Sequence, residues 1–274
     1  MKLFLIRHAE CEHNVGQALG NADNLTRVGQ EQARQLARYL SDRPVRFTRV
    51  LSSDLDRATD TARVICKHQM ENGPVLEPFR TAKLREQCFG CGGLSMDVTH
   101  IESMASMRAR VHGVLRDHIL PEMANRVKSR GAVIGVVGHA IILQVFWACL
   151  TDLFGSQSFH LARDATWMGS NYMRPKWSNT GIMELDIRPG GPPEEMLLEN
   201  AVQVNVQPPW LTKSTPPVTP DGSAPLIGWS VTILTVDSTP HLTVETQAAP
   251  KIMPFSRQPL MAESYRVPGA RVAW

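Results

Sequence analysis

The chain opens with a strongly apolar segment that ends directly in two polar side chains. Leu3 to Ile6 are all apolar, and Arg7 and His8 follow them with no turn residue in between. A short apolar run of this kind is typical of a strand that is buried on both faces of a parallel sheet. Ligands of such sheets bind just beyond the carboxyl ends of the strands. The segment therefore predicts an α/β fold in which His8 lies at the mouth of a site.

Two later segments repeat this arrangement. Val50 to Ser53 leads to Arg57, and Val133 to Gly138 is followed at once by His139. A lone histidine beside apolar residues is most often only the polar end of a core strand, and His8 alone would not exclude that simpler interpretation. Parallel strands end at a common edge of their sheet, however, so the three segments predict two imidazoles and two guanidinium groups in one place.

Helix-like segments separate these strands. Thr26 is a plausible N-cap for a helix that Pro44 stops, and Ser53 with Asp56 resembles a capping box for a second helix. A third helix is expected from His139 to Leu150, directly after its strand. This alternation of strands and helices predicts a central, mostly parallel sheet flanked by helices.

Two further elements are expected between the second and third strands. A short strand is predicted from Val75 to Phe79. A helix is predicted from Ile101 to about Ile119, and Pro121 should end or kink it.

The last third of the chain differs from the rest. Gly181 to Ile187 and Val231 to Val236 alternate apolar and polar residues, which predicts a late antiparallel hairpin. The connection between them, about residues 188–228, contains nine prolines, and we expect most of it to lack packed structure. Residues 243–274 show no periodicity and are expected to form a disordered tail of unknown partner, which leaves residues 1–242 as one domain.

Length and charge limit the possible classes of protein. A chain of 274 residues with 43% hydrophobic content can bury a full core as one domain. There is no secretory signal and no run of eighteen apolar residues, so we expect a cytoplasmic protein without a membrane partner. A net charge of +3 without a basic stripe does not favour nucleic acid, whereas a small anionic substrate is compatible with it.

The cysteines do not indicate a disulfide framework or a metal centre. There are five of them at irregular spacing, which favours reduced thiols. Cys88 and Cys91 match a C-x-x-C pattern, but a zinc ribbon needs a second pair, which the chain lacks. We therefore expect no metal site and no cofactor.

The motifs of the common α/β enzymes are also missing. The chain has no P-loop, no G-x-S-x-G and no clean dinucleotide fingerprint, so the histidine and arginine set must supply the chemistry. A neutral imidazole is a good nucleophile towards phosphorus at pH 7, and the phosphoramidate that forms is readily hydrolysed. Phosphoryl transfer in two steps then requires no metal ion.

Four separated motifs resemble those of a known family, the histidine phosphatase (phosphoglycerate mutase-like) superfamily, and they occur in the family's order. They are Arg7-His8-Ala9-Glu10 with Asn14, Ser53 to Ala58 with Thr61-Ala62, Leu84-Arg85-Glu86, and Gly138-His139. The resemblance covers about Met1 to Asp152, and Asn179-Thr180-Gly181 is similar to the family's closing segment. It is nearest the fructose-2,6-bisphosphatase, or TIGAR-like, branch and implies a phosphoglycerate mutase-like fold.

The resemblance also implies roles for individual residues. His8 corresponds to the phosphorylated nucleophile, and Glu86 to the proton donor that later activates the hydrolytic water. The residues that correspond to ligands of the phosphoryl oxygens are Arg7, Asn14, Arg57 and His139. The neighbouring guanidinium charges agree with this assignment, because they keep His8 neutral and stabilise the transferring group.

The sequence departs from the family pattern at several positions. Ala9 replaces the usual Gly, Cys11 the usual Thr, and Ala140 a frequent Gly. The interval between Glu86 and His139 is also short for the family and lacks most of the insert that usually caps the site. These differences bear on which substrate the site accepts.

Together, the residues and the resemblance predict a metal-independent phosphomonoesterase that acts through a phosphohistidine on small phosphorylated metabolites such as sugar phosphates. One alternative is a phosphoglycerate-type phosphomutase, which returns the phosphoryl group to a second hydroxyl. A noncatalytic phosphate-sensing or scaffold protein is an alternative of another class, and the Pro-rich segment favours it. Within the site, the alternative role of Glu86 is a surface salt bridge, and His13 is expected to face solvent or the loop.

Overall fold

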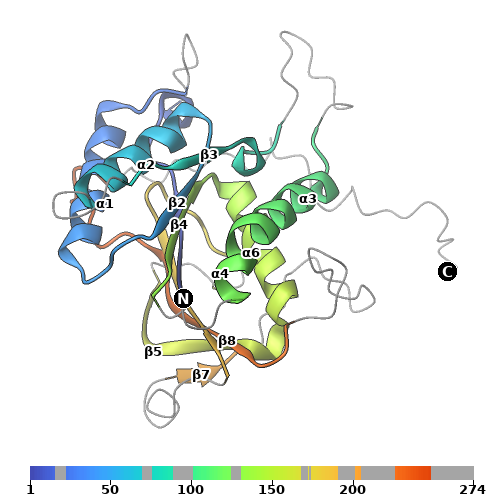
Figure 1. Cartoon of the computed structure of the whole chain (residues 1–274). Coiled ribbons are helices and arrows are strands. Elements are labelled where there is room, and N and C mark those ends of the chain that lie inside the picture. Colours follow the sequence, from blue (N-terminus) through green and yellow to red (C-terminus); the bar gives the residue numbers. More distant parts are fainter. Residues whose placement is uncertain are drawn as a thin grey trace, which may run out of the picture.

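The structure is a computed structural model that describes most of the chain (Figure 1). The described residues are 1–15, 23–69, 76–88, 101–124, 131–167, 172, 174–190, 201–204 and 226–247. Within them, one sheet has the strand order β3-β2-β4-β1-β6-β8-β5-β7.

The parallel part of the sheet holds the three segments whose strand ends were predicted to meet. It consists of β3 (Phe79–Thr81), β2 (Arg49–Ser53), β4 (Val133–Gly138) and β1 (Lys2–Arg7), each parallel to its neighbour. The predicted α/β class with a mostly parallel sheet is confirmed. The short strand expected at Val75 begins later, at Phe79.

The other part of the sheet is mixed. β6 (Ile182–Pro189) runs antiparallel to both β1 and β8 (Trp229–Ser238), which confirms the late antiparallel pair. β5 (Phe159–Trp167) lies parallel to β8 and was not predicted, because charged residues interrupt its apolar pattern. β7 (Ala201–Gln203) pairs with β5, so the Pro-rich connection contains at least this short strand.

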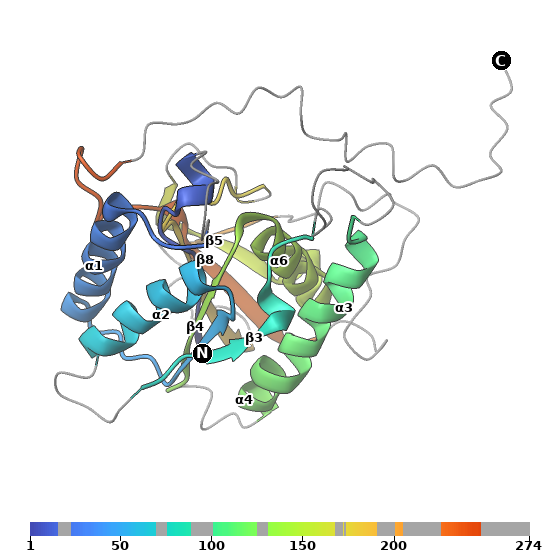
Figure 2. The same ribbon diagram turned by 90° about the horizontal axis from the view of Figure 1, so that it is seen from above.

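Helices cover both faces of the parallel strands (Figure 2). α1 (Arg27–Asp42) and α2 (Asp56–Gln69) share one core cluster with Phe4 and Ile6 of β1. On the opposite face, Leu3 and Leu5 belong to the cluster that includes α3 (Met104–Val114) and α6 (Ala140–Phe154). The alternate side chains of β1 are thus buried on both sides, as the apolar run at the start of the chain predicts.

The predicted helix of residues 101–119 is longer than expected. α3 passes through a π-helical turn at Leu115–Ile119 into α4 (Leu120–Ala124). Pro121 therefore does not end the helix. Proline lacks the amide that would bond one turn back, and the wider π turn directly before it fits this missing hydrogen bond.

The predicted N-cap of the first helix is confirmed, whereas the predicted capping box of the second is wrong. Thr26 caps α1, since its hydroxyl oxygen accepts from the Gly29 amide at 2.9 Å. Ser53 does not form the expected capping box: its hydroxyl accepts from Leu55 at 3.3 Å, and α2 starts at Asp56. At Gly29, a Cβ would collide with the carbonyl oxygen of Glu10, so only glycine allows α1 to approach the end of β1 this closely.

Short 3-10 segments complete the described chain at Glu12–Val15, Ala82–Leu84 and Ser156–Ser158. Past the boundary predicted at residue 242, Thr246 is buried and its carbonyl accepts from Gln32 Nε2 at 2.8 Å. Residues 248–274 of the expected tail lie outside the described residues. In the part of the chain that the structure describes, no helix is both long and apolar enough to cross a lipid bilayer.

Candidate active site

The carboxyl ends of β1 and β4 bring the two predicted histidines together. These strands are parallel, with Arg7 opposite Gly138, and the His8 amide donates to the Gly138 carbonyl at 3.0 Å. The next residue of each strand is a histidine, and the His8 and His139 ring centroids are 4.9 Å apart at an interplanar angle of 58°. Both rings are buried. The predicted juxtaposition of two imidazoles is confirmed.

A backbone contact fixes the tautomer of His8. Its Nδ1 lies 2.7 Å from the Ala9 carbonyl oxygen, which can only accept a hydrogen bond. Nδ1 therefore carries the proton in the neutral ring, and the lone pair is on Nε2. The Ala9 backbone is itself held, because its amide donates to Thr61 Oγ1 at 3.1 Å. The arrangement presents Nε2 of His8 as a nucleophile.

The same reasoning assigns the proton of His139. Arg57, in the first turn of α2, donates from Nε to His139 Nδ1 at 3.2 Å. A guanidinium has no acceptor, so Nδ1 of His139 is unprotonated and Nε2 carries the proton. Nε2 is buried and finds no hydrogen-bond partner within the described residues. Among the described residues it is therefore a buried donor without an acceptor.

Arg7 provides a second donor of this kind. Its NH1 group donates to the Trp177 carbonyl at 2.7 Å, whereas its buried Nε has no hydrogen-bond partner among the described residues. Buried donors are rarely left unpaired in proteins, because each unmade hydrogen bond costs about 1–3 kcal/mol. An anion that accepted from Arg7 Nε and His139 Nε2 would recover that cost.

Burial and nearby charges keep both imidazoles neutral. Burial lowers the pKa of His8 well below its ordinary value, and three neighbours lower it further: His139, Arg7 and Arg57. Burial is likewise the largest cause of the lowered pKa of His139, followed by the two guanidinium groups. A neutral His8 retains its lone pair, so the charges that would hold an anion also preserve the nucleophile.

Glu86 lies against the start of α6, the helix that begins directly after His139. Its carboxylate accepts from the amides of Ile141 at 3.3 Å, Ile142 at 3.2 Å and Gln87 at 3.0 Å. His139, at the N-cap position, makes no side-chain capping bond, so Glu86 satisfies amides that the helix itself leaves unpaired. Glu86 is thus a carboxylate bound by backbone amides, in contrast to the alternative role as a surface salt bridge.

The segment that carries Glu86 is fixed from α3. Arg110 donates to the carbonyls of Lys83 at 2.9 Å and Arg85 at 3.0 Å, and it forms a bidentate ion pair with Glu102 at 2.8 and 2.6 Å. Contacts from α3 therefore hold the segment that carries Glu86.

Asn14 joins the site from the 3-10 segment after β1. Its Oδ1 accepts from the Cys11 amide and from Asn179 Nδ2, both at 3.2 Å, and from Cys11 Sγ at 3.3 Å. This leaves the Nδ2 end of Asn14 as the donor that can serve an anion. His13, beside it, is exposed as expected.

A turn before β6 closes the site from the other side, and the sequence indicated only its Asn179-Thr180-Gly181 part. Asn179 Nδ2 donates to the His8 carbonyl at 3.0 Å, and the Thr180 amide donates to the Arg7 carbonyl at 3.1 Å. With Trp177, which accepts from Arg7, the turn holds both residues that end β1.

A further histidine contacts this turn. His241 Nε2 lies 2.9 Å from Thr180 Oγ1. Because Thr180 Oγ1 donates to the Asn179 carbonyl at 2.7 Å, the imidazole is the donor to the hydroxyl oxygen. Burial lowers the pKa of His241 to about 4 from an ordinary value of 6.5.

The lowered pKa of His241 predicts that the folded protein loses stability in acid. Between pH 6.5 and about 4 the unfolded chain binds more protons at His241 than the folded chain, so the free energy of unfolding falls as the pH is lowered through this window. Above pH 6.5 both states are neutral, and the effect disappears. We expect His241→Gln, which keeps a donor for Thr180, to remove acid destabilisation on the order of 2 kcal/mol near pH 4.5. Urea unfolding of both proteins at pH 7.5 and pH 4.5 measures this, and equal losses on acidification would refute it.

Arg57 has an ionic partner that the sequence did not reveal. Its NH1 group pairs with Asp23, whose side chain is 36% exposed, whereas that of Arg57 is 12% exposed. Asp23 comes from the loop between β1 and α1, and no motif or spacing singled it out. A carboxylate thus occupies one side of a guanidinium that was predicted to bind phosphate.

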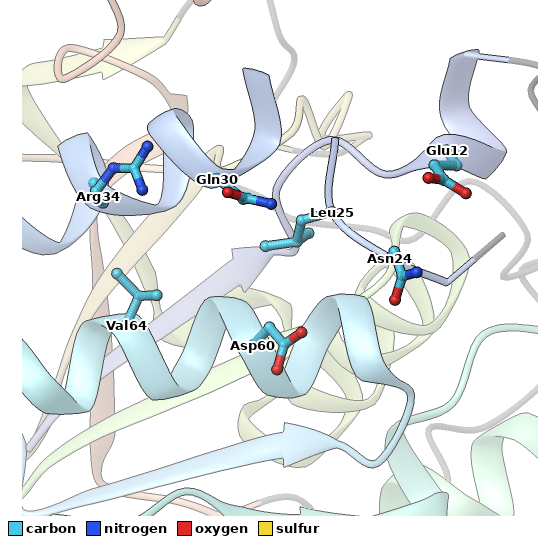
Figure 3. A pocket seen from close by; sticks show the side chains of 7 residues that line it. All are labelled: Glu12, Asn24, Leu25, Gln30, Arg34, Asp60 and Val64. Atoms are coloured by element: carbon cyan, nitrogen blue, oxygen red, sulfur yellow. The ribbon is translucent and has the colours of Figure 1, made fainter. Parts of the chain in front are cut away.

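A separate hollow of about 530 Å³ lies between α1 and α2 (Figure 3). Its lining includes Glu12 and Asp60, with Val64 of α2, and none of the predicted site residues lines it. In the described lining, the two carboxylates outnumber the guanidinium of Arg34, which disfavours a phosphate. The buried histidine pair and this hollow are therefore separate features of the structure.

Among the described residues, no group of three or more histidine, cysteine or acidic side chains could hold a metal ion. Cys11, Cys66 and Cys149 are buried free thiols. Cys91, one half of the C-x-x-C pattern, lies outside the described residues.

Comparison with known proteins finds relatives that are similar to part of this chain. A broad-specificity phosphatase of Saccharomyces cerevisiae is 39% identical over 108 residues, which cover 38% of this chain and 45% of that protein. A fructose-2,6-bisphosphatase TIGAR of Xenopus tropicalis is 38% identical over 94 residues, 32% of each chain. A 2,3-bisphosphoglycerate-dependent phosphoglycerate mutase of Rhizobium etli is 34% identical over 90 residues, 32% of this chain and 42% of that protein.

The chain matches less than half the length of each of these relatives. The family model of the histidine phosphatase superfamily (branch 1) matches the segment that contributes Arg7, His8, Asn14, Arg57 and Glu86 to the site. Residues 3–94 of this chain are thus similar to branch 1 of the histidine phosphatase superfamily.

Proposed function

We propose that the chain is a metal-independent phosphomonoesterase that acts through a phosphohistidine on His8, with small phosphorylated metabolites such as sugar phosphates as substrates. The observation that carries the proposal is the hydrogen bond of 2.7 Å between His8 Nδ1 and the Ala9 carbonyl, which leaves Nε2 unprotonated. This nucleophile is buried beside two guanidinium groups and the Nε2 donor of His139.

In the first step, the lone pair of His8 Nε2 attacks phosphorus, and the bond between phosphorus and the ester oxygen breaks. Arg7, Arg57 and His139 would donate to the oxygens of the transferring group, and Asn14 would add its Nδ2 donor. Glu86 would give a proton to the leaving oxygen, so the substrate departs as a neutral alcohol. The products of this step are the alcohol and phosphohistidine.

In the second step, water attacks the phosphohistidine. The new bond joins the water oxygen to phosphorus, the bond to Nε2 breaks, and Glu86 accepts the proton that water releases. Three amides hold the Glu86 carboxylate at 3.0 to 3.3 Å, which fixes its position for both steps. Inorganic phosphate leaves, and His8 is neutral again.

Release of inorganic phosphate from a panel of phosphomonoesters tests the proposal. We expect turnover of at least one small phosphorylated metabolite in the presence of a metal chelator. A complete lack of turnover on sugar phosphates, phosphoglycerates and aryl phosphates would favour the noncatalytic phosphate-sensing alternative.

Similarity to a phosphoglycerate mutase keeps transfer to a second hydroxyl as the alternative reaction. Water labelled with heavy oxygen separates the two outcomes. A phosphatase incorporates the label into inorganic phosphate, whereas a mutase produces an isomeric phosphate ester without label.

We also propose a cytoplasmic location, in agreement with the free thiols of Cys11, Cys66 and Cys149. The only partner proposed is the small phosphorylated substrate, with neither nucleic acid nor a membrane surface.

The Asp23–Arg57 ion pair leads to a prediction about phosphate affinity. A phosphoryl oxygen and the Asp23 carboxylate would compete for the same guanidinium. Because exposed ion pairs contribute about 0–1 kcal/mol, we expect Asp23→Asn to tighten the binding of inorganic phosphate or vanadate by roughly two- to fivefold. Inhibition of phosphatase activity by each anion measures this change.

Glu31→Gln provides the matched control. Glu31 pairs with Arg34 on α1 at 2.9 Å, and its substitution changes the net charge by the same amount. We expect no change in anion affinity for that variant. Equal tightening in both variants would mean that net charge, and not the pairing with Arg57, limits phosphate binding.

A further inference from the structure

We propose that Asp237 is a positioning residue for phosphoryl transfer, and that it acts by holding the turn of residues 177–181 against Arg7 and His8. This inference rests on the proposed function. Asp237 is 1% exposed and lies near the end of β8, far from every motif in the sequence. No predicted role was assigned to it.

Sheet topology brings Asp237 to the site. β6 lies between β1 and β8 and is antiparallel to both, with Ile182 opposite Ile6 on one side and Ser238 on the other. The carboxyl ends of β1 and β8 therefore meet at the amino end of β6, where the turn of residues 177–181 enters. Only β6 separates β8, which carries Asp237, from β1, the strand that leads to His8.

The Asp237 carboxylate binds the turn directly. Oδ1 accepts from the Ser178 amide at 2.6 Å, and Oδ2 accepts from the Ser178 hydroxyl at 2.9 Å. A Cβ at Gly181 would collide with Oδ1. The turn closes over the carboxylate so tightly that residue 181 must be glycine.

The turn transmits this position to the residues that end β1. Trp177, next to Ser178, accepts from Arg7 NH1 at 2.7 Å. On the other side of Ser178, Asn179 Nδ2 donates to the His8 carbonyl at 3.0 Å. Through the two neighbours of one serine, Asp237 thus controls both the guanidinium and the backbone of the nucleophile.

The backbone conformation of the turn and of Asp237 also supports a positioning role. Within the described chain, the non-glycine residues with positive φ are Trp177 at 55°, Thr180 at 57° and Asp237 at 48°. L-residues rarely adopt this region, and they remain there only where neighbouring contacts hold them. Two of these residues lie in the turn, and the third is the aspartate that binds it. Loss of the Asp237 carboxylate would therefore allow the turn to relax.

Asp237 also acts on Arg7 through its charge. Burial lowers the pKa of Arg7, and the carboxylates of Glu86 and Asp237 are among the groups that oppose this shift. Because Arg57 acts on Arg7 in the opposite direction, the negative charge of Asp237 helps to keep the buried guanidinium charged.

The experiment compares Asp237→Ala with wild type, Asp237→Asn and Asp152→Ala. Asp152 is the matched control, because it is a buried carboxylate of α6, 2% exposed, that pairs with Arg108 of α3. Single-turnover formation of phosphohistidine is measured by rapid quench, and the histidine ring resonances are recorded by nitrogen NMR. Thermal unfolding reports the stability of each variant.

We expect Asp237→Ala to slow phosphohistidine formation about 10- to 100-fold, because misplacement by a fraction of an ångström at a reacting centre has effects of this size. The ring resonances of His8 should shift. Asp237→Asn, whose amide oxygen can still accept from Ser178, should recover part of the rate. Asp152→Ala should lose stability but keep both the rate and the His8 resonances.

Failure of the inference differs from failure of the proposed function. Wild-type protein that forms no phosphohistidine would overturn the function, and the His8 resonances alone would then decide whether Asp237 positions that residue. Unchanged resonances in Asp237→Ala, or equal rate losses in Asp237→Ala and Asp152→Ala, would overturn the positioning role.

Discussion

His8→Ala is expected to abolish phosphatase turnover, with a loss of about 10⁴-fold or more in kcat/KM. The substitution removes the imidazole that the Ala9 carbonyl holds through Nδ1. The Nε2 lone pair that would attack phosphorus is lost with it. His139 cannot replace it, because its Nδ1 accepts from Arg57 and its Nε2 carries a proton. Steady-state phosphate release from the best substrate of the panel measures the loss.

His13→Ala is the matched control. His13 lies five residues further along the chain but is exposed, and it should keep most of the wild-type rate. If His13→Ala lost as much activity as His8→Ala, the nucleophile would have been assigned to the wrong imidazole.

The second large effect is expected from Glu86→Gln. The glutamine oxygen can still accept from the amides at the start of α6, but the side chain can no longer transfer a proton. An alkyl leaving group needs that proton, whereas p-nitrophenolate does not. We therefore expect a loss of about 10²-fold or more with alkyl phosphates and a much smaller loss with p-nitrophenyl phosphate in the His8 phosphorylation step.

Single-turnover rates with both substrates check this difference. The aryl substrate is the internal control, because it reports on folding and phosphate binding in the same variant. Equal losses on the two substrates would show that Glu86 positions substrate or water and does not supply the proton.

The sequence predicted those parts of the site that lie at strand ends. Arg7, His8 and His139 follow apolar runs, and parallel strands must end at one edge of a sheet, so their meeting follows from the pattern alone. Arg57 is similar, because a helix that begins directly after a strand keeps its first turn near the same edge. Local pattern and fold geometry determine these positions together.

The contacts that support the site were harder to predict. Ser178 and Asp237 are 59 residues apart, and their hydrogen bonds depend on β6 and β8 being neighbours in the sheet. Pairing between distant strands leaves no periodic trace in the sequence of either one. The Asp23–Arg57 pair was missed for a related reason, since a single acidic residue in a polar loop resembles any other.

Glu86 shows a third kind of limit. The family resemblance identified the residue, but its binding by the amides at the start of α6 required the position of that helix. A salt bridge was the simplest alternative for a charged residue beside a loop, and only the structure distinguishes it from a carboxylate bound by the backbone.

The central claim, a phosphohistidine on His8, is tested most directly by trapping that intermediate. Wild-type protein is mixed with a phosphomonoester that carries labelled phosphorus, quenched within milliseconds in base, and digested for peptide mapping. The account predicts a rapid, stoichiometric burst of label that is stable in base, lost in acid and located on His8. Turnover without bound label, or label on any other side chain, would contradict it.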